Sequence, residues 1–158
     1  MSERTNDGAS AHDQTPENEV AQLADASRAH EPGELGALAC KLYDENPNLT
    51  EEEAYEAFIG WVESRGIDLW PHQEEALMSI MVGDHVILGT PTGSGKSLVA
   101  LGMHFIAMCF GERSYYTAPI KALVSEKFFN LVDILGRENV GMITGDVHIN
   151  TSAPVICC

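Results

Sequence analysis

The chain has 158 residues, enough for one domain with additions but too few for two full-sized domains. Its net charge is −15, and acids outnumber bases along the whole chain, so no segment has the basic patch typical of a nucleic-acid-binding surface. No apolar run approaches the length of a membrane span, and the polar start of the chain lacks the apolar stretch of a signal peptide. We therefore expect a cytoplasmic protein without a membrane partner.

Residues 1–34 are predicted to form a disordered acidic tail. This stretch contains no Phe, Trp or Tyr and is rich in Asp, Glu, Ser, Ala and Asn. Such a composition buries too little apolar surface to offset the entropy that a chain loses on ordering. Regular structure is therefore expected to begin only near Leu35.

A pair of helices is predicted next. Apolar residues recur at helical spacing from Leu35 onwards and indicate a helix that ends before Pro47. Thr50 and Glu53 have the spacing of a capping box, which opens a second helix with an apolar stripe. Together these signals predict a small helical hairpin over 35–66.

The pattern changes at residue 67, after which predicted helices and strands alternate. This alternation indicates an α/β domain over 67–158, with a parallel sheet and right-handed crossovers. Helices are predicted over 71–81, 97–110 and 121–135, and strands over 85–88, 114–117, 140–143 and 154–158.

The four cysteines have neither the paired spacing of metal ligands nor the spacing of a disulfide framework. Cys40 and Cys109 fall on apolar faces of predicted helices. Both thiols are therefore predicted to be buried.

The most informative motif is Thr-Pro-Thr-Gly-Ser-Gly-Lys-Ser at residues 90–97, between a predicted strand and a predicted helix. Strand, glycine loop and helix form the context of a phosphate-binding loop. Gly93 and Gly95 permit backbone angles that let successive N–H groups curve around a phosphate. The other residues expected to line the nucleotide are Thr90, Pro91, Thr92 and Ser94.

Two side chains at the end of this loop carry specific chemistry. Lys96 would supply a cation to the β- and γ-phosphates, which makes it the expected catalytic residue, and the Ser97 hydroxyl would bind Mg²⁺. The general loop pattern has glycine where this chain has Thr90. The alternative is a Gly/Ser-rich connector that merely turns the chain, and the strand before and helix after it argue against that reading.

Three further clusters accompany the loop. In the first, the Gln73 amide has a donor and an acceptor that could read the edge of adenine, although an ordinary surface glutamine is the default. In the second, Pro119 precedes a predicted helix whose free N–H groups, with Lys121 nearby, could hold a nucleic-acid phosphate, or it could simply mark a turn. The third is the loop over 144–146, where Asp146 alone would be a turn residue.

In this order and spacing, the four clusters resemble the first RecA-like domain of superfamily-two DEAD/DEAH-box helicases. The similarity is greatest to DExH RNA helicases of the superkiller, exosome-assisting type, and it covers about residues 67–158. The resemblance implies a P-loop NTPase with an incomplete, parallel RecA-like sheet. It also implies ATP and Mg²⁺ as cofactors, single-stranded RNA as the partner, and ATP hydrolysis coupled to strand unwinding in the intact protein.

The resemblance assigns adenine to Gln73. At Glu126 the family usually has glutamine, so a phosphate contact is not expected there. The Asp-Glu-x-His box and the second RecA-like domain with its arginine fingers are not among these residues, so we expect the chain by itself to be inactive. The residues expected along the nucleic-acid strand are Pro119, Lys121, Thr144 and Gly145.

Two other functions stay open on the sequence. One is a P-loop ATPase or GTPase of another class, which Gln73 and the two later clusters disfavour. The other is a non-catalytic fragment whose N-terminal residues 1–66 bind a protein partner, which the acidic net charge favours.

Overall fold

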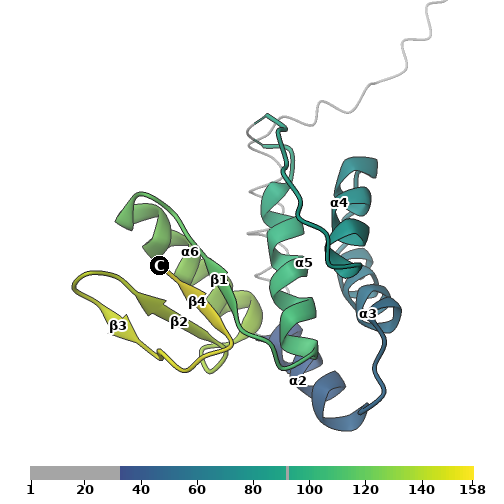
Figure 1. Ribbon diagram of the computed structural model, residues 1–158, viewed down its shortest axis with the longest axis horizontal. Coiled ribbons are helices and arrows are strands. Elements are labelled where there is room, and N and C mark those ends of the chain that lie inside the picture. The colour runs from purple at the N-terminus through teal and green to yellow at the C-terminus, as the bar shows by residue number, and fades with distance from the viewer. Residues whose placement is uncertain (1–32, 92) are drawn as a thin grey trace, which may run out of the picture.

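The computed structural model describes residues 33–91 and 93–158, so nearly all of the predicted tail lies outside the described residues. The described part is an α/β arrangement, which confirms the predicted fold class (Figure 1). No helix within these residues is both long enough and apolar enough to span a bilayer. The helices are α2 (Glu34–Glu45), α3 (Glu51–Glu63), α4 (Pro71–Met81), α5 (Lys96–Cys109) and α6 (Lys121–Leu135). The strands are β1 (Ser114–Tyr116), β2 (Val140–Ile143), β3 (His148–Ile149) and β4 (Val155–Cys157).

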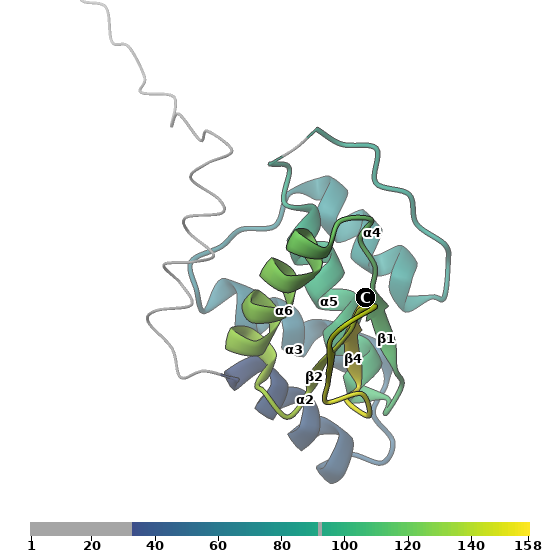
Figure 2. The same cartoon turned by 90° about the vertical axis from the view of Figure 1, so that its left-hand side faces the viewer.

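The sheet has the strand order β1-β4-β2-β3. β4 lies between β1 and β2 and is parallel to both, whereas β3 is antiparallel to β2. Helix α6 packs on β2 and β4, while α5 contacts the sheet at β1 (Figures 1 and 2). The sequence did not predict β3, because both of its residues are exposed and no apolar alternation marks so short a strand.

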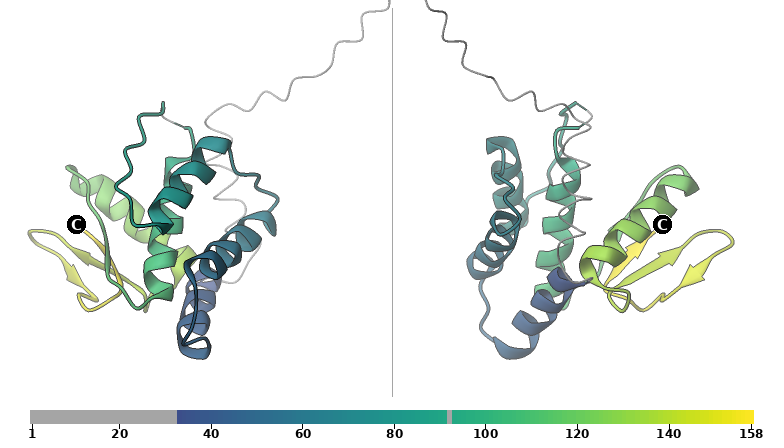
Figure 3. Two further views of the ribbon diagram at one scale, coloured as in Figure 1. Left: turned by 45° about the vertical axis from the view of Figure 1, so that its right-hand side comes forward. Right: turned by 180° about the vertical axis from the view of Figure 1, so that it is seen from behind.

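The strand predicted over 85–88 does not form. This segment joins none of the strand pairs among the described residues, and Ile87 is 96% exposed. It runs beside the helices, away from the sheet, with Val86 and Leu88 partly buried against the core (Figures 1 and 3). An apolar run becomes a strand only when another strand supplies its ladder hydrogen bonds, and β1, which borders the sheet, pairs only with β4 here.

Helix α5 is the centre of the apolar core. It was predicted as an amphipathic stretch, but it is buried on most sides because α2, α3, α4 and β1 all pack against it (Figure 1). Gly102 makes this packing close, since a Cβ there would lie 2.5 Å from Leu77 Cδ2 and 2.9 Å from Phe58 Cε1. The rings of Phe58 and Phe105 lie 5.7 Å apart over the same turn.

Helices α2 and α3, expected as a hairpin, both pack on α5 and so share its core. The capping box at the start of α3 is confirmed, because Thr50 Oγ1 accepts from the Glu53 N–H and Glu53 Oε2 accepts from the Thr50 N–H. At the other end of α3, Arg65 lies 3.8 Å from the Trp61 ring centroid and 3.1 Å from Glu34 of α2. This ion pair links the two helices directly.

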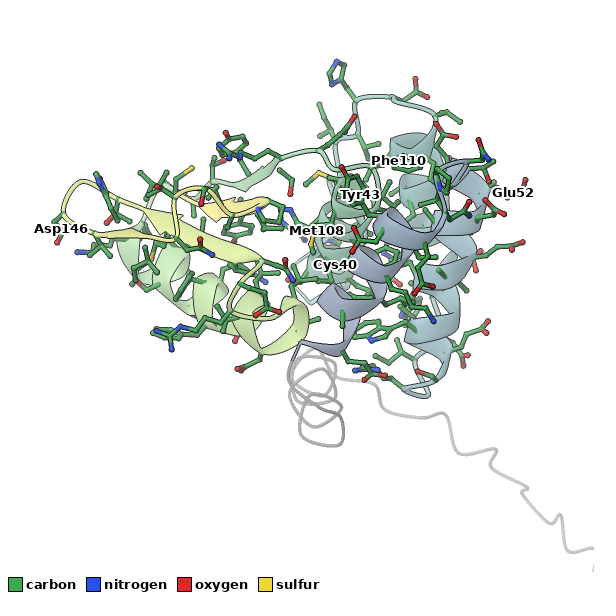
Figure 4. All side chains as sticks on the ribbon, turned by 90° about the horizontal axis from the view of Figure 1, so that it is seen from below. Cys40, Tyr43, Glu52, Met108, Phe110 and Asp146 are labelled. Carbon is green, nitrogen blue, oxygen red and sulfur yellow. The ribbon has the colours of Figure 1, made fainter. Side chains whose placement is uncertain are left out.

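The two cysteine predictions had different outcomes. Cys109 is buried as predicted, but Cys40 is exposed, and its Sγ lies 3.7 Å from Asn139 Oδ1. The apolar spacing along α2 did not show which edge of the helix faces the core. Figure 4 shows Tyr43 of the same helix near the end of α5, where a Cβ on Gly111 would lie 2.7 Å from the Tyr43 ring.

Gly36 sets how closely α2 approaches α6. A Cβ at this position would lie 1.7 Å from the Leu135 carbonyl oxygen and 2.8 Å from Asn139 Nδ2. Backbone at the end of α6 cannot move aside as a flexible side chain would. Any side chain at residue 36 therefore forces the two helices apart.

We expect Gly36→Ala to lower the free energy of unfolding by about 1–3 kcal/mol, because the added methyl overpacks the α2–α6 contact. Gly60→Ala is the matched control, since it also adds a methyl within a helix but has nothing within 4 Å of that position. The control should be neutral or stabilise by up to about 1 kcal/mol through helix propensity. Urea unfolding followed by circular dichroism measures both, and equal effects would contradict the close contact.

Candidate nucleotide-binding site

A glycine loop leads into the N-terminus of α5. Gly93 has φ 88° and Gly95, the N-cap of the helix, has φ 70°, both in the left-handed region that favours glycine. Such angles let backbone N–H groups form a concave anion site, and the helix N-terminus adds a positive potential. The described part of the loop therefore fits a phosphate group. Thr92, also predicted to line the nucleotide, lies outside the described residues.

In this conformation the ammonium of Lys96 is bound to its own loop. Nζ donates to the carbonyl oxygens of Thr90 at 2.6 Å and Pro91 at 2.7 Å. The Ser94 hydroxyl donates to Thr90 Oγ1 at 2.5 Å, so the threonine that stands in place of the usual glycine helps to close the loop. A phosphate would replace neutral carbonyls with a charged acceptor, which forms the stronger hydrogen bond with an ammonium.

Two side chains of α4 form hydrogen bonds with the backbone of the loop. Gln73 is only 2% exposed; its Nε2 donates to the Gly95 carbonyl at 3.2 Å, and its Oε1 accepts from the Trp70 N–H at 2.8 Å. A Cβ on Gly95 would lie 1.8 Å from that Nε2, so glycine also permits this close approach. His72 Nε2 lies 3.0 Å from the Ser94 carbonyl oxygen. The Gln73 amide would have to exchange these partners in order to read adenine.

Ser97, the predicted Mg²⁺ ligand, is exposed in the first turn of α5. Its Oγ accepts a hydrogen bond of 3.3 Å from Nζ of Lys127, a residue of α6. The same ammonium lies 5.6 Å from the Tyr116 ring centroid, and burial lowers the pKa of Lys127. Residues 33–91 and 93–158 contain no cluster of three or more His, Cys, Asp or Glu side chains that could hold a metal. In the predicted arrangement, the Ser97 hydroxyl would be the side-chain oxygen offered to Mg²⁺.

A second cluster lies where α6 begins. Lys121 in the first turn of α6 forms an ion pair with Asp146, and the Thr144 hydroxyl donates to the other oxygen of that carboxylate at 3.1 Å. Hydrogen bonds from Lys121 and then Thr144 lower the pKa of the Asp146 carboxyl. Asp146 sits at the tip of the β2–β3 turn (Figure 4), beside exposed Gly145. The structure thus brings together Lys121 and Thr144, two residues predicted to line the nucleic-acid strand.

Helix α6 connects the two clusters. Lys121 and Lys127 are separated by about 9 Å along the helix axis, at about 1.5 Å per residue. Pro119 lies exposed just before the helix, whose N-cap is Ile120. Sequence reasoning missed Lys127 and His72, although both stand next to residues that it considered. Their spacing alone could not show that α4 and α6 turn these side chains toward the loop.

The DEAD/DEAH box helicase family matches residues 70–153, more than half of the chain. This chain belongs to the DEAD/DEAH box helicase family. The match begins just before α4, includes the loop and both clusters, and ends just before β4. The family resemblance expected from the four motifs is confirmed, and the family as a whole uses ATP with Mg²⁺ and acts on nucleic acid.

Several helicases from distant organisms are similar to the chain over the same region. Probable helicase HelY of Mycobacterium tuberculosis is 36% identical over 84 residues, 53% of this chain and 9% of that protein. The chloroplastic DExH-box ATP-dependent RNA helicase DExH15 of Arabidopsis thaliana is 37% identical over 84 residues, 53% of this chain and 7% of that protein. Antiviral helicase SKI2 of Saccharomyces cerevisiae is 38% identical over 91 residues, 53% of this chain and 7% of that protein. The chain spans less than a tenth of the length of these relatives.

A buried histidine lies within α5, the helix that follows the loop. His104 of α5 is 1% exposed, and its Nδ1 lies 2.8 Å from the Ser114 hydroxyl of β1. Nε2 is buried without a hydrogen-bond partner among the described residues. Burial, and to a smaller extent the charge of Lys127, lowers the pKa of His104 from 6.5 to about 4. The imidazole is therefore neutral in the folded protein at neutral pH.

This shift predicts a loss of stability in mild acid. Below pH 6.5 the unfolded chain binds a proton at His104 that the folded chain does not accept until about pH 4, so stability falls as the pH drops through this window. The loss due to His104 should reach about 2 kcal/mol by about pH 5. His104→Leu should remove this part of the pH dependence. Unfolding free energies measured between about pH 7.5 and about pH 5 test it, and parallel curves for both proteins would contradict it.

Proposed function

We propose that the chain is the nucleotide-binding part of an ATP-dependent helicase that acts on single-stranded RNA. The observation that carries this proposal is the course of α6, which starts at the Lys121 cluster and places Lys127 against Ser97 in the nucleotide loop. One helix thus contacts both sites, and a rigid secondary element is one route by which coupling between ATP and a nucleic-acid strand can be carried. Two relatives, a DExH-box ATP-dependent RNA helicase and an antiviral helicase, are helicases by name, which supports this proposal.

The proposed roles follow the geometry of the two clusters. Lys96 would neutralise the β- and γ-phosphates after leaving its loop carbonyls, and Ser97 would bind Mg²⁺. The nucleic-acid backbone would lie against the start of α6, with its phosphates at Lys121 and near Pro119, Thr144 and Gly145. ATP hydrolysis and strand unwinding belong in this proposal to the intact protein.

The acidic net charge argues for a local rather than a broad contact with RNA. At −15 the chain repels a polyanion overall, so binding would depend on the few cations at the start of α6. The same charge supports a second candidate function, in which residues 1–66 bind a protein partner. A cytoplasmic location is part of the proposal and is supported by free thiols at Cys40, Cys109, Cys157 and Cys158.

Lys96→Ala should abolish the rise in melting temperature that Mg-ATP causes in the unmodified chain. ATP at about 100 times its dissociation constant stabilises a folded protein by about 2.7 kcal/mol, and this gain requires the phosphate contacts of Lys96. Lys41→Ala is the control, because Lys41 is an exposed lysine of α2 that pairs with Glu45 at 3.9 Å. An undiminished thermal shift in Lys96→Ala would contradict the assignment of this loop as the phosphate-binding site.

Adenine recognition by Gln73 predicts that Gln73→Ala weakens ATP binding by about tenfold more than GTP binding, because an amide chosen for adenine cannot pair equally well with guanine. His72→Ala is the matched control, since His72 contacts the same loop at Ser94 but is not assigned to the base. It should weaken ATP and GTP equally. Fluorescence competition titrations measure both ratios, and an equal loss in Gln73→Ala would restrict Gln73 to bracing the loop.

A further inference from the structure

Lys127 is a charged group whose position supports the proposed function but which has no chemical role in it. It lies within α6, and its Nζ reaches across to Ser97 Oγ at 3.3 Å, with the Tyr116 ring on another side. Neither Lys127 nor Lys96 takes part in an ion pair among the described residues. The N-terminus of α5 adds positive potential at the same place. A partly buried ammonium that forms no ion pair within these residues therefore donates to a neutral hydroxyl, and the nearby charge of Glu126 raises the pKa of Lys127 less than burial lowers it.

That hydroxyl has a second use in the proposed function. Mg²⁺ binds oxygen ligands at about 2.0–2.1 Å, so a metal on Ser97 Oγ would lie no more than about 5.4 Å from an ammonium that stays 3.3 Å from the same atom. The lone pairs of the oxygen could serve both, but the two cations would repel each other in a partly desolvated site. The two positions compete.

We propose that Lys127 occupies Ser97 until a Mg²⁺-nucleotide binds, and that the metal then displaces its ammonium. The inference rests on the proposed function, because it needs Ser97 to be the Mg²⁺ ligand of a bound nucleotide. Displacement frees a side chain of α6, the helix that carries Lys121 of the strand-facing cluster. Binding of the metal would thereby change the contacts of α6, the helix that begins at the proposed nucleic-acid site.

The test measures how nucleotide binding depends on Mg²⁺. A fluorescent ATP analogue is titrated with Mg²⁺ in the unmodified chain, in Lys127→Met and in Lys127→Gln. Both variants remove the competing charge, so each should reach half-saturation at about five- to tenfold lower Mg²⁺. Binding of the analogue in excess chelator should change less than twofold. Lys41→Met, at an exposed lysine of α2, should leave the Mg²⁺ dependence unchanged.

The same substitution in a Ser97→Ala variant tests whether the effect depends on the contact between Lys127 and Ser97. In Ser97→Ala the shared oxygen is gone, so adding Lys127→Met should no longer shift the Mg²⁺ midpoint. Circular dichroism melts show that each variant is folded, and Lys127→Gln serves if Lys127→Met is not.

Three results would overturn the inference. An unchanged Mg²⁺ midpoint in both Lys127 variants would exclude competition. Weaker binding with and without Mg²⁺ would instead mean that Lys127 contacts the phosphates directly. No binding of the analogue by the unmodified chain, at any Mg²⁺ concentration, would remove the proposed function and this inference with it.

Discussion

Burial of α5 is the constraint on which the rest of the structure depends. Four other elements pack around this helix, and the close approach at Gly102 lets Phe58 and Leu77 reach its backbone. A helix held on most sides cannot shift, so its N-terminus presents Gly95 and Ser97 at a fixed position. The loop before it can then be shaped by a few polar contacts rather than by a sheet. This explains how the glycine loop is held at the start of α5 although the segment before it forms no strand.

The loop is stabilised by contacts that a ligand would have to replace. Lys96 is satisfied by two carbonyls, Ser94 by Thr90, and the Gln73 amide by Gly95. The contacts of Ser94 and Gln73 join neutral groups and contribute about 1 kcal/mol net each, whereas those of Lys96 have a charged donor and contribute about 1.5–3 kcal/mol each. A triphosphate offers charged acceptors, and the attraction between opposite charges makes their hydrogen bonds to an ammonium stronger than those of neutral carbonyls. The internal contacts therefore hold the loop closed, but a bound triphosphate could replace them.

Charge is distributed unevenly despite the strongly acidic composition. Lys96, Lys121 and Lys127 lie in the loop and on α6, whereas the N-terminal helices are mostly acidic on their exposed faces. Asp146 forms an ion pair with Lys121, whereas Lys96 and Lys127 form none within residues 33–91 and 93–158, although the charge of Glu126 acts on Lys127. An overall charge could not reveal this, because electrostatic interactions at a site are short-ranged at physiological salt.

The sequence by itself determined the elements whose signals are local. Helix bounds at α4 and α6, the capping box at Thr50 and the glycine loop all follow from spacing, capping and backbone freedom within a few residues. Tertiary structure alone decided which segments become strands. The sequence therefore predicted a strand over 85–88 that does not form, and it did not predict β3, which does. Tertiary structure also decided that Gln73 braces the loop and that Lys127 reaches Ser97. These contacts join residues more than twenty positions apart, and only the packing of helices around α5 brings them together.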